Sequence, residues 1–110
     1  MSTTPTVLVA GVALTGSAAT YYTAPTGART TVKSASVTNT TGGNISLTLY
    51  RVPSGGTAAA TNTVISARTI SGGETYNCPE LVNKVLHAGD TIQAKGLNLS
   101  LDVSGAVTTV

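Results

Sequence analysis

The sequence has no Trp and no Phe, only four Tyr, a single Cys and few charged residues. Without the two largest aromatic side chains, the core must be built from Val, Leu, Ile, Ala and Tyr, which favours thin packing between sheets over a deep aromatic interior. A single Cys excludes an intrachain disulfide, and with it the class of small extracellular domains that depend on disulfides. Synthesis and assembly in a reducing cytoplasm fit this composition better.

Charged residues make up 9% of the chain, against roughly 25% in a typical soluble domain. The six Lys and Arg are spread singly along the sequence. Proteins that bind nucleic acids cluster their basic residues and add stacking aromatics, and the sequence shows neither feature. A surface with so few charges resists association poorly. We therefore expect partner subunits to cover part of the surface, and no nucleic-acid partner.

The N-terminal apolar run, TVLVAGVALTGSAAT at residues 6–20, has the composition of a secretory signal peptide. However, the preceding MSTTP lacks the basic residues that begin such a peptide. The run is also too short to span a bilayer, which needs about 20 apolar residues, so we expect no membrane partner. We expect residues 6–15 to form a first strand covered on both faces. Residues 1–5 are expected to be a polar arm, and residues 6–110 a single domain.

Strand signals recur at short intervals, separated by Gly, Pro, Asn and Ser. TTGG, after a strand at residues 28–39, is expected to turn a hairpin into the strand that begins at Ile45. The clearest alternation sets Leu97, Leu99, Leu101 and Val103 against Asn98, Ser100, Asp102 and Ser104. In the strand at 28–39, Lys33, Ala35 and Val37 are expected on one face. The only plausible helical turn is PELVNKVL at residues 79–86, where Pro79 suits a helix start.

These patterns predict an all-β fold, an antiparallel β-sandwich of about eight short strands with at most one short helical turn. The sandwich is jelly-roll-like or immunoglobulin-like, and the sequence does not decide between the two strand orders. Parallel α/β folds are disfavoured because the strands are too close in sequence for crossover helices.

The sequence offers little catalytic chemistry, since it contains one His, one Cys and four carboxylates. The only local group is Cys78, Glu80, His87 and Asp90, and its spacing matches neither a thiol nucleophile nor a zinc site. The competing interpretation is structural, with Cys78 as a small buried apolar residue and Asp90 as the cap of a turn. None of the Gly pairs opens a helix or precedes the Lys of a phosphate loop. We therefore expect no enzyme, no metal and no cofactor.

Tyr21 and Tyr22 are adjacent in an expected strand, so one ring can enter the core while the other faces outward. An outward Tyr can anchor a protein interface or stack on a sugar. With only Tyr50 and Tyr76 as further aromatics, contact with the core or with a partner subunit is favoured over a sugar site.

The sequence resembles a known class of proteins in three stretches, which are YYTAPTGARTTVKSASVTNTTGGNISLTLYRVPSGG, ISGGETYNC and VLHAGDTIQAKG. Their shared elements are Tyr-x-x-Pro-x-Gly, Asn39 before a Gly turn, Leu-Tyr-x-Val-Pro, a Gly-Glu turn and Ala-Gly-Asp-Thr-Ile. The pattern, over roughly residues 18–96, resembles small all-β virion structural proteins of tailed bacteriophages. These elements form turns and strands, so they are more specific for architecture than for function.

The resemblance implies a capsid decoration (cement) protein, which binds the outer shell as a dimer or trimer and clamps neighbouring major-capsid subunits. It implies the capsid surface of the virion as the location, after synthesis in the host cytoplasm. The candidate partner-contact residues are Thr3, Thr4, Pro5, Val7, Val9, Tyr21 and Tyr22. One alternative is a tail-fibre, baseplate or collar domain that recognises host-surface glycans through an exposed Tyr or Asn/Asp cluster. A secreted pilin-like or surface-layer subunit is a further alternative, which the absent basic n-region disfavours.

Overall fold

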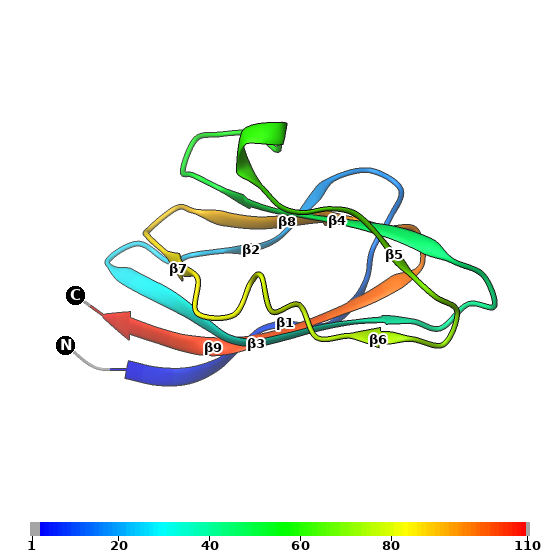
Figure 1. Ribbon diagram of the computed structural model, residues 1–110. Helices are drawn as coiled ribbons and strands as arrows, with labels where there is room; N and C mark the ends of the chain where they lie inside the picture. Colours follow the sequence, from blue (N-terminus) through cyan, green and yellow to red (C-terminus); the bar gives the residue numbers. More distant parts are fainter. Residues whose placement is uncertain (1–2, 110) are drawn as a thin grey trace.

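The computed structural model describes residues 3–109, which form nine strands and one short 3-10 helix (Figure 1). The strands make two antiparallel sheets packed face to face, which confirms the predicted all-β sandwich. Their bounds are β1 (Thr3–Ala13), β2 (Ala19–Thr23), β3 (Ala28–Asn39), β4 (Ile45–Val52), β5 (Thr63–Ile70), β6 (Thr75–Tyr76), β7 (Val85–Leu86), β8 (Thr91–Lys95) and β9 (Leu99–Thr109), with the helix η1 at Ala60–Asn62. Within residues 3–109, no helix has the length and apolar character needed to cross a membrane.

The strand order identifies the sandwich as a jelly roll. Sheet A has the order β1-β9-β3-β6, with β7 also paired to β3, and sheet B has the order β2-β8-β4-β5. The pairs are nested: β1 lies beside β9, β2 beside β8, β3 beside β6 and β7, and β4 beside β5. The chain is therefore one long hairpin rolled into two sheets, the arrangement of jelly rolls. Since β6 and β7 share one edge of β3, the fold has about eight strand positions, as the sequence predicts.

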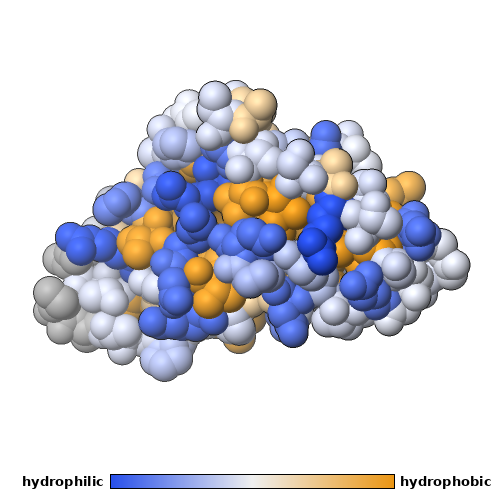
Figure 2. Space-filling model, in the orientation of Figure 1, coloured by the Kyte–Doolittle hydropathy of each residue, from blue (hydrophilic) through white to orange (hydrophobic). Residues whose placement is uncertain are grey.

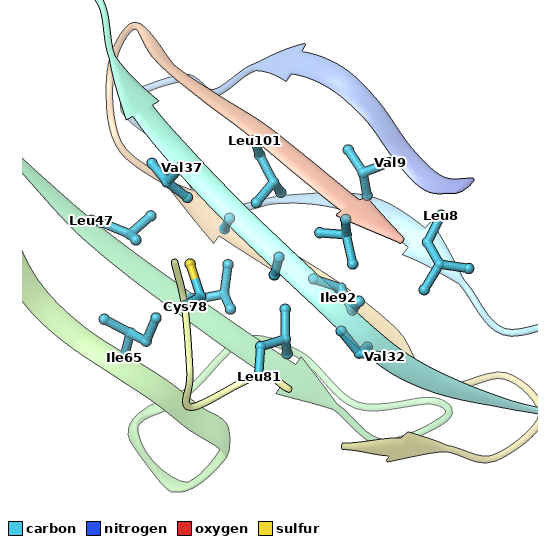
Figure 3. Packing of buried hydrophobic residues seen from close by; sticks show 14 of the residues in the cluster. Leu8, Val9, Val32, Val37, Leu47, Ile65, Cys78, Leu81, Ile92 and Leu101 are labelled. Carbon is cyan, nitrogen blue, oxygen red and sulfur yellow. The ribbon is translucent and has the colours of Figure 1, made fainter. Parts of the chain in front are cut away.

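The core lies between the sheets and consists of aliphatic side chains together with Cys78 (Figure 3). The alternation predicted for the last strand is confirmed, because Leu99, Leu101 and Val103 are fully buried. Leu97 is the exception: it lies in the turn before β9 and is 58% exposed. On β4, Leu47 and Leu49 are fully buried in the same cluster.

The prediction of a first strand covered on both faces is wrong. Within residues 3–109, β1 is an edge strand that pairs only with β9, and of its residues only Leu8 and Val9 are buried. Two register shifts against β9 interrupt its alternation, one between Val7 and Val9 and one around Gly11, whose φ is +57°. Such bulges are one way in which proteins disrupt an exposed sheet edge.

The predicted polar arm is also corrected in part. Thr3, Thr4 and Pro5 pair with residues of β9 and belong to sheet A, so the strand begins before residue 6. The hydroxyl groups of Thr3 and Thr108 form a hydrogen bond of 2.9 Å between the two strands. Met1 and Ser2, the rest of the expected arm, lie outside the described residues.

A bulge in β3 changes the expected alternation of that strand. The register against β9 shifts between Val32 and Ser34, which leaves Lys33 as the extra residue. Ala35 is buried on the core side, while Lys33 is exposed, so the prediction that they share a face is wrong. Because of this extra residue, Val32 and Ala35 both face the core although they are three residues apart, and Val32 is fully buried.

TTGG does not turn a hairpin, because β3 and β4 belong to different sheets. The chain crosses from one sheet to the other at Asn39, whose side chain is fully buried. Its amide donates hydrogen bonds to the carbonyls of Gly43 at 2.7 Å and Ile70 at 2.8 Å. Its side-chain oxygen accepts from the backbone N–H of Thr41 at 2.9 Å. These bonds hold the corner between the sheets.

No helix forms at residues 79–86. Residues 79–83 are successive turns, and Asn83 has a φ of +69°, which no helix accommodates. The segment bonds back to β3 instead, because the Asn83 N–H donates to the Val32 carbonyl at 2.7 Å. Leu81 is thereby held fully buried between the sheets. The single helical turn in residues 3–109 is η1, in the loop between β4 and β5.

Candidate functional site

Three of the seven predicted contact residues share the outer face of sheet A. Thr3, Pro5 and Val7 lie opposite Thr108, Ala106 and Ser104 of β9, whose side chains point away from the core. Val7 is the most exposed large hydrophobic residue in the described part of the chain, at 61%.

This outer face continues across β9 and β3 to β7. Its side chains are small and mostly carry hydroxyl groups, and its only charges in the described residues are Arg29, Lys33 and Asp102. The register places an apolar row across it, formed by Pro5, Ala106 and Val85 and interrupted by Thr31 between the last two; Val85 is 40% exposed. We call this surface the A face; it comprises Thr3, Pro5, Val7, Arg29, Thr31, Lys33, Ser34, Ser36, Thr38, Thr75, Val85, Ser100, Asp102, Ser104, Ala106 and Thr108.

Two other predicted contact residues of β1 do not lie on the A face. Val9 is only 2% exposed and packs in the core beside Leu8, as Figure 3 shows, so its prediction as a contact residue is wrong for this fold. Thr4 is exposed but lies opposite Val107, on the other side of β1 from its neighbours Thr3 and Pro5.

Tyr21 and Tyr22 lie on β2, in sheet B, and the structure does not bring them to the A face. Both rings are half-buried and pack against the core, because a register shift between Thr20 and Tyr22 breaks the alternation of the strand. The Tyr22 hydroxyl lies 2.8 Å from that of the buried Thr30 and links the two sheets. Tyr50 is buried and Tyr76 half-buried, so no Tyr stands out as a stacking platform.

Within the group of Cys78, Glu80, His87 and Asp90, the side chains of Cys78 and Asp90 have structural roles. Cys78 is fully buried, and burial raises the pKa of its thiol to about 11. The Asp90 carboxylate accepts hydrogen bonds from the backbone N–H groups of His87 at 2.9 Å and Ser54 at 3.0 Å, which confirms it as a turn cap. Among residues 3–109, no three His, Cys, Asp or Glu side chains come together as metal ligands.

The structure adds a polar cleft that the sequence analysis missed. It lies between the β4–β5 connection and the segment that precedes β7, and its volume is about 490 Å³. Arg51, Glu80 and Lys84 bring charges to it from positions up to 33 residues apart in sequence. The only signal in the sequence is that most charged residues follow Arg51, which does not indicate where they meet.

The side of the molecule seen in Figure 1 carries no single large apolar surface. Figure 2 shows that its apolar side chains form separate patches divided by hydrophilic ones. The Arg68 guanidinium lies 3.9 Å from the centre of the Tyr76 ring and covers it. Hydrophobic docking of a partner is therefore not favoured on this side.

No protein-family model and no curated protein sequence matches the chain.

Proposed function

We propose that this chain is a non-enzymatic structural protein of a tailed-phage virion, a capsid decoration (cement) protein. It binds the outer shell and stabilises contacts between major-capsid subunits. Two things support the proposal: the resemblance of its turn and strand motifs to such proteins, and the A face. The jelly roll itself is compatible with many functions and adds little.

The A face is the observation that carries the proposal. Its Ser, Thr and Ala side chains are short, so a flat partner can approach the sheet closely along several strands. Hydroxyl groups can both donate and accept hydrogen bonds, which suits a partner surface of mixed polarity. The apolar row from Pro5 to Val85 supplies the surface whose burial favours association.

Weak contacts between each domain and the capsid are sufficient for stable binding to a shell. A shell presents many equivalent binding positions, and a dimer or trimer of this chain would engage two or three of them at once, so the effective affinity exceeds that of one domain. The major capsid protein and further copies of the chain are the proposed partners. The proposed location is the capsid surface of the virion, after synthesis in the host cytoplasm.

A tail location, as a fibre, baseplate or collar domain that recognises host glycans, is the second candidate. The half-buried tyrosines do not favour it, because a stacking platform requires an exposed ring. The charged cleft beside Glu80 does favour it, since it is a concave site open to an external ligand.

The proposal is tested by light scattering on the purified protein and by mixing it with undecorated phage heads. We expect a stable dimer or trimer that sediments with the heads and raises the temperature at which they rupture. A monomer that stays in the supernatant would contradict the decoration function. Binding to host cells in place of heads would support the tail location.

A further inference from the structure

The cleft beside Glu80 concentrates charge in a chain that has little of it. Three of its lining residues, Arg51, Glu80 and Lys84, belong to the ten Lys, Arg, Asp and Glu residues of the whole sequence. The remaining lining residues are Pro53, Thr61, Asn62, Thr63 and Val64. A volume of about 490 Å³ falls within the usual size range of small-molecule sites.

The carboxylate of Glu80 is held in one position. The Tyr76 hydroxyl lies 2.6 Å from Glu80 Oε1 and 2.8 Å from Oε2, so it donates to both oxygens. This hydrogen bond lowers the pKa of the Glu80 carboxyl, which keeps it ionised at neutral pH. The Arg68 guanidinium lies 3.9 Å from the centre of the Tyr76 ring and packs over it. The carboxylate therefore offers its remaining acceptor capacity to a ligand.

The two cations of the cleft differ in how they are held. Arg51 Nη1 donates to the Val85 carbonyl at 3.2 Å and lies 4.0 Å from Asp90 Oδ2, so the guanidinium is positioned. The Lys84 ammonium has no hydrogen bond or ion pair with any group in residues 3–109. The Lys84 ammonium is therefore the cationic group of the cleft that can pair with an anionic ligand.

The wall opposite Glu80 is also ordered before any ligand binds. Asn62 accepts a hydrogen bond from the Ala59 N–H at 2.9 Å and donates one to the Thr57 carbonyl at 2.9 Å. The Thr63 hydroxyl donates to the Ala59 carbonyl at 3.0 Å. A wall fixed in this way loses little conformational entropy on binding.

We propose that this cleft binds a sugar that carries a carboxylate, such as a uronic acid unit of a polysaccharide. Lys84 and Arg51 receive the sugar carboxylate, and Glu80 accepts hydrogen bonds from ring hydroxyls. Val64 and Pro53 offer apolar surface to the C–H face of the ring. A nucleic acid fits poorly, because the Arg68 guanidinium already lies over the nearby Tyr76 ring, on which a base would otherwise stack.

The site does not depend on where the virion holds the domain. Figure 1 shows that η1 and the β4–β5 connection project beyond sheet B, away from β1, β3 and β9. A domain attached through the A face would leave the cleft exposed. The two proposals therefore fail separately: head binding tests one and sugar binding tests the other.

The test is a nuclear magnetic resonance titration of the isotope-labelled protein with trigalacturonate. We expect saturable shifts confined to the backbone amides around Thr61–Val64 and Glu80–Val85, with a Kd on the order of 1 mM, as suits a small polar ligand. Maltotriose, which lacks the carboxylates, should cause much smaller shifts. Triglutamate, which carries carboxylates without ring hydroxyls, should bind about tenfold more weakly if Glu80 contributes as proposed.

Two exposed Lys residues give a matched pair of variants. Lys84→Gln should weaken trigalacturonate binding about tenfold, while Lys33→Gln, on the A face, should leave it unchanged. Both side chains are exposed, so we expect both variants to unfold at the same urea concentration as the parent protein. The proposal is overturned if no saturable shift occurs, if the shifts lie elsewhere, if Lys33→Gln has the same effect as Lys84→Gln, or if triglutamate binds equally well.

Discussion

The side-chain amide of Asn39 donates a hydrogen bond of 2.8 Å to the carbonyl of Ile70, a residue 31 positions further along the chain. Asn39 ends β3 in sheet A and Ile70 ends β5 in sheet B, so the bond joins the two sheets at one end of the sandwich. Both residues are fully buried. A buried amide with four partners stabilises only the arrangement in which all four are present.

Asn39→Ala should therefore lower the free energy of unfolding by about 3 kcal/mol, because it removes the hydrogen bonds of the Asn39 side chain to the Ile70 and Gly43 carbonyls and to the Thr41 N–H. Urea unfolding measures the loss. Asn44→Ala, at an exposed position five residues away, is the control and should change stability by less than about 0.5 kcal/mol. Equal stabilities of the two variants would show that the corner is not held by Asn39.

Gly105 of β9 is predicted to be essential for the bulge in β3. A Cβ atom at this position would overlap the backbone carbonyl oxygen of Thr31 on the neighbouring strand. Since that oxygen belongs to the strand ladder, it cannot move without breaking the pairing of β3 with β9. Gly105→Ala should cost about 2 to 3 kcal/mol of stability.

The control for this change is Gly16→Ala, because a Cβ atom at Gly16 would meet nothing within 4 Å. Both variants remove one Gly from the unfolded chain, so the difference between their unfolding midpoints isolates the packing conflict. Identical midpoints would mean that β3 and β9 separate without cost at this point.

Tyr76→Phe is predicted to lower stability in a pH-dependent way. The hydrogen bond from Tyr76 lowers the pKa of Glu80 in the folded protein, so its contribution is present above the unfolded pKa of about 4.3 and is lost as the pH falls through the lower folded value. We expect the variant to be less stable by about 1 kcal/mol near pH 7, a value reduced for the exposure of Glu80. The difference should narrow near pH 3.

The stabilisation from the hydrogen bond between Tyr76 and Glu80 is also lost at alkaline pH. Partial burial and the hydrogen bond to Glu80 raise the pKa of Tyr76 to about 12, so this contribution is complete below about pH 10 and is lost as the pH rises through 12. Tyr21→Phe is the matched control, because the Tyr21 hydroxyl has no hydrogen bond within residues 3–109. Urea unfolding at acidic and neutral pH checks both variants, and a difference for Tyr76→Phe that does not change with pH would contradict the assignment.

The sequence was sufficient to predict the all-β sandwich, because strand periodicity and turn residues are local signals. In β9 the alternation from Leu99 to Val103 is regular, and the structure follows it. The prediction fails where a bulge adds one residue, at Leu8, at Tyr21 and at Lys33, since a bulge depends on the partner strand and leaves no periodic trace. In β1 the register shifts between Val7 and Val9, so these two side chains do not share a face.

The candidate surfaces required the strand order. Val85 joins Pro5 and Ala106 in one apolar row only because β7 and β1 lie on opposite sides of β3 and β9. Likewise, Arg51 and Lys84 face one cleft because the β4–β5 connection folds beside the segment that precedes β7. Non-local pairings of this kind cannot be deduced from the periodicity of either segment alone.

The central claim is that the A face attaches the protein to the virion shell. The most direct measurement is the fraction of protein that sediments with undecorated heads, compared between Val7→Glu and Thr69→Glu. Val7 is exposed on the β1 edge of the A face, while Thr69 is exposed on β5 of sheet B, so each change adds one charge without entering the core. We expect Val7→Glu to weaken head binding about tenfold, through the burial of an unpaired charge, and Thr69→Glu to bind like the parent protein. Undiminished binding of Val7→Glu, or an equal loss in both variants, would contradict the claim.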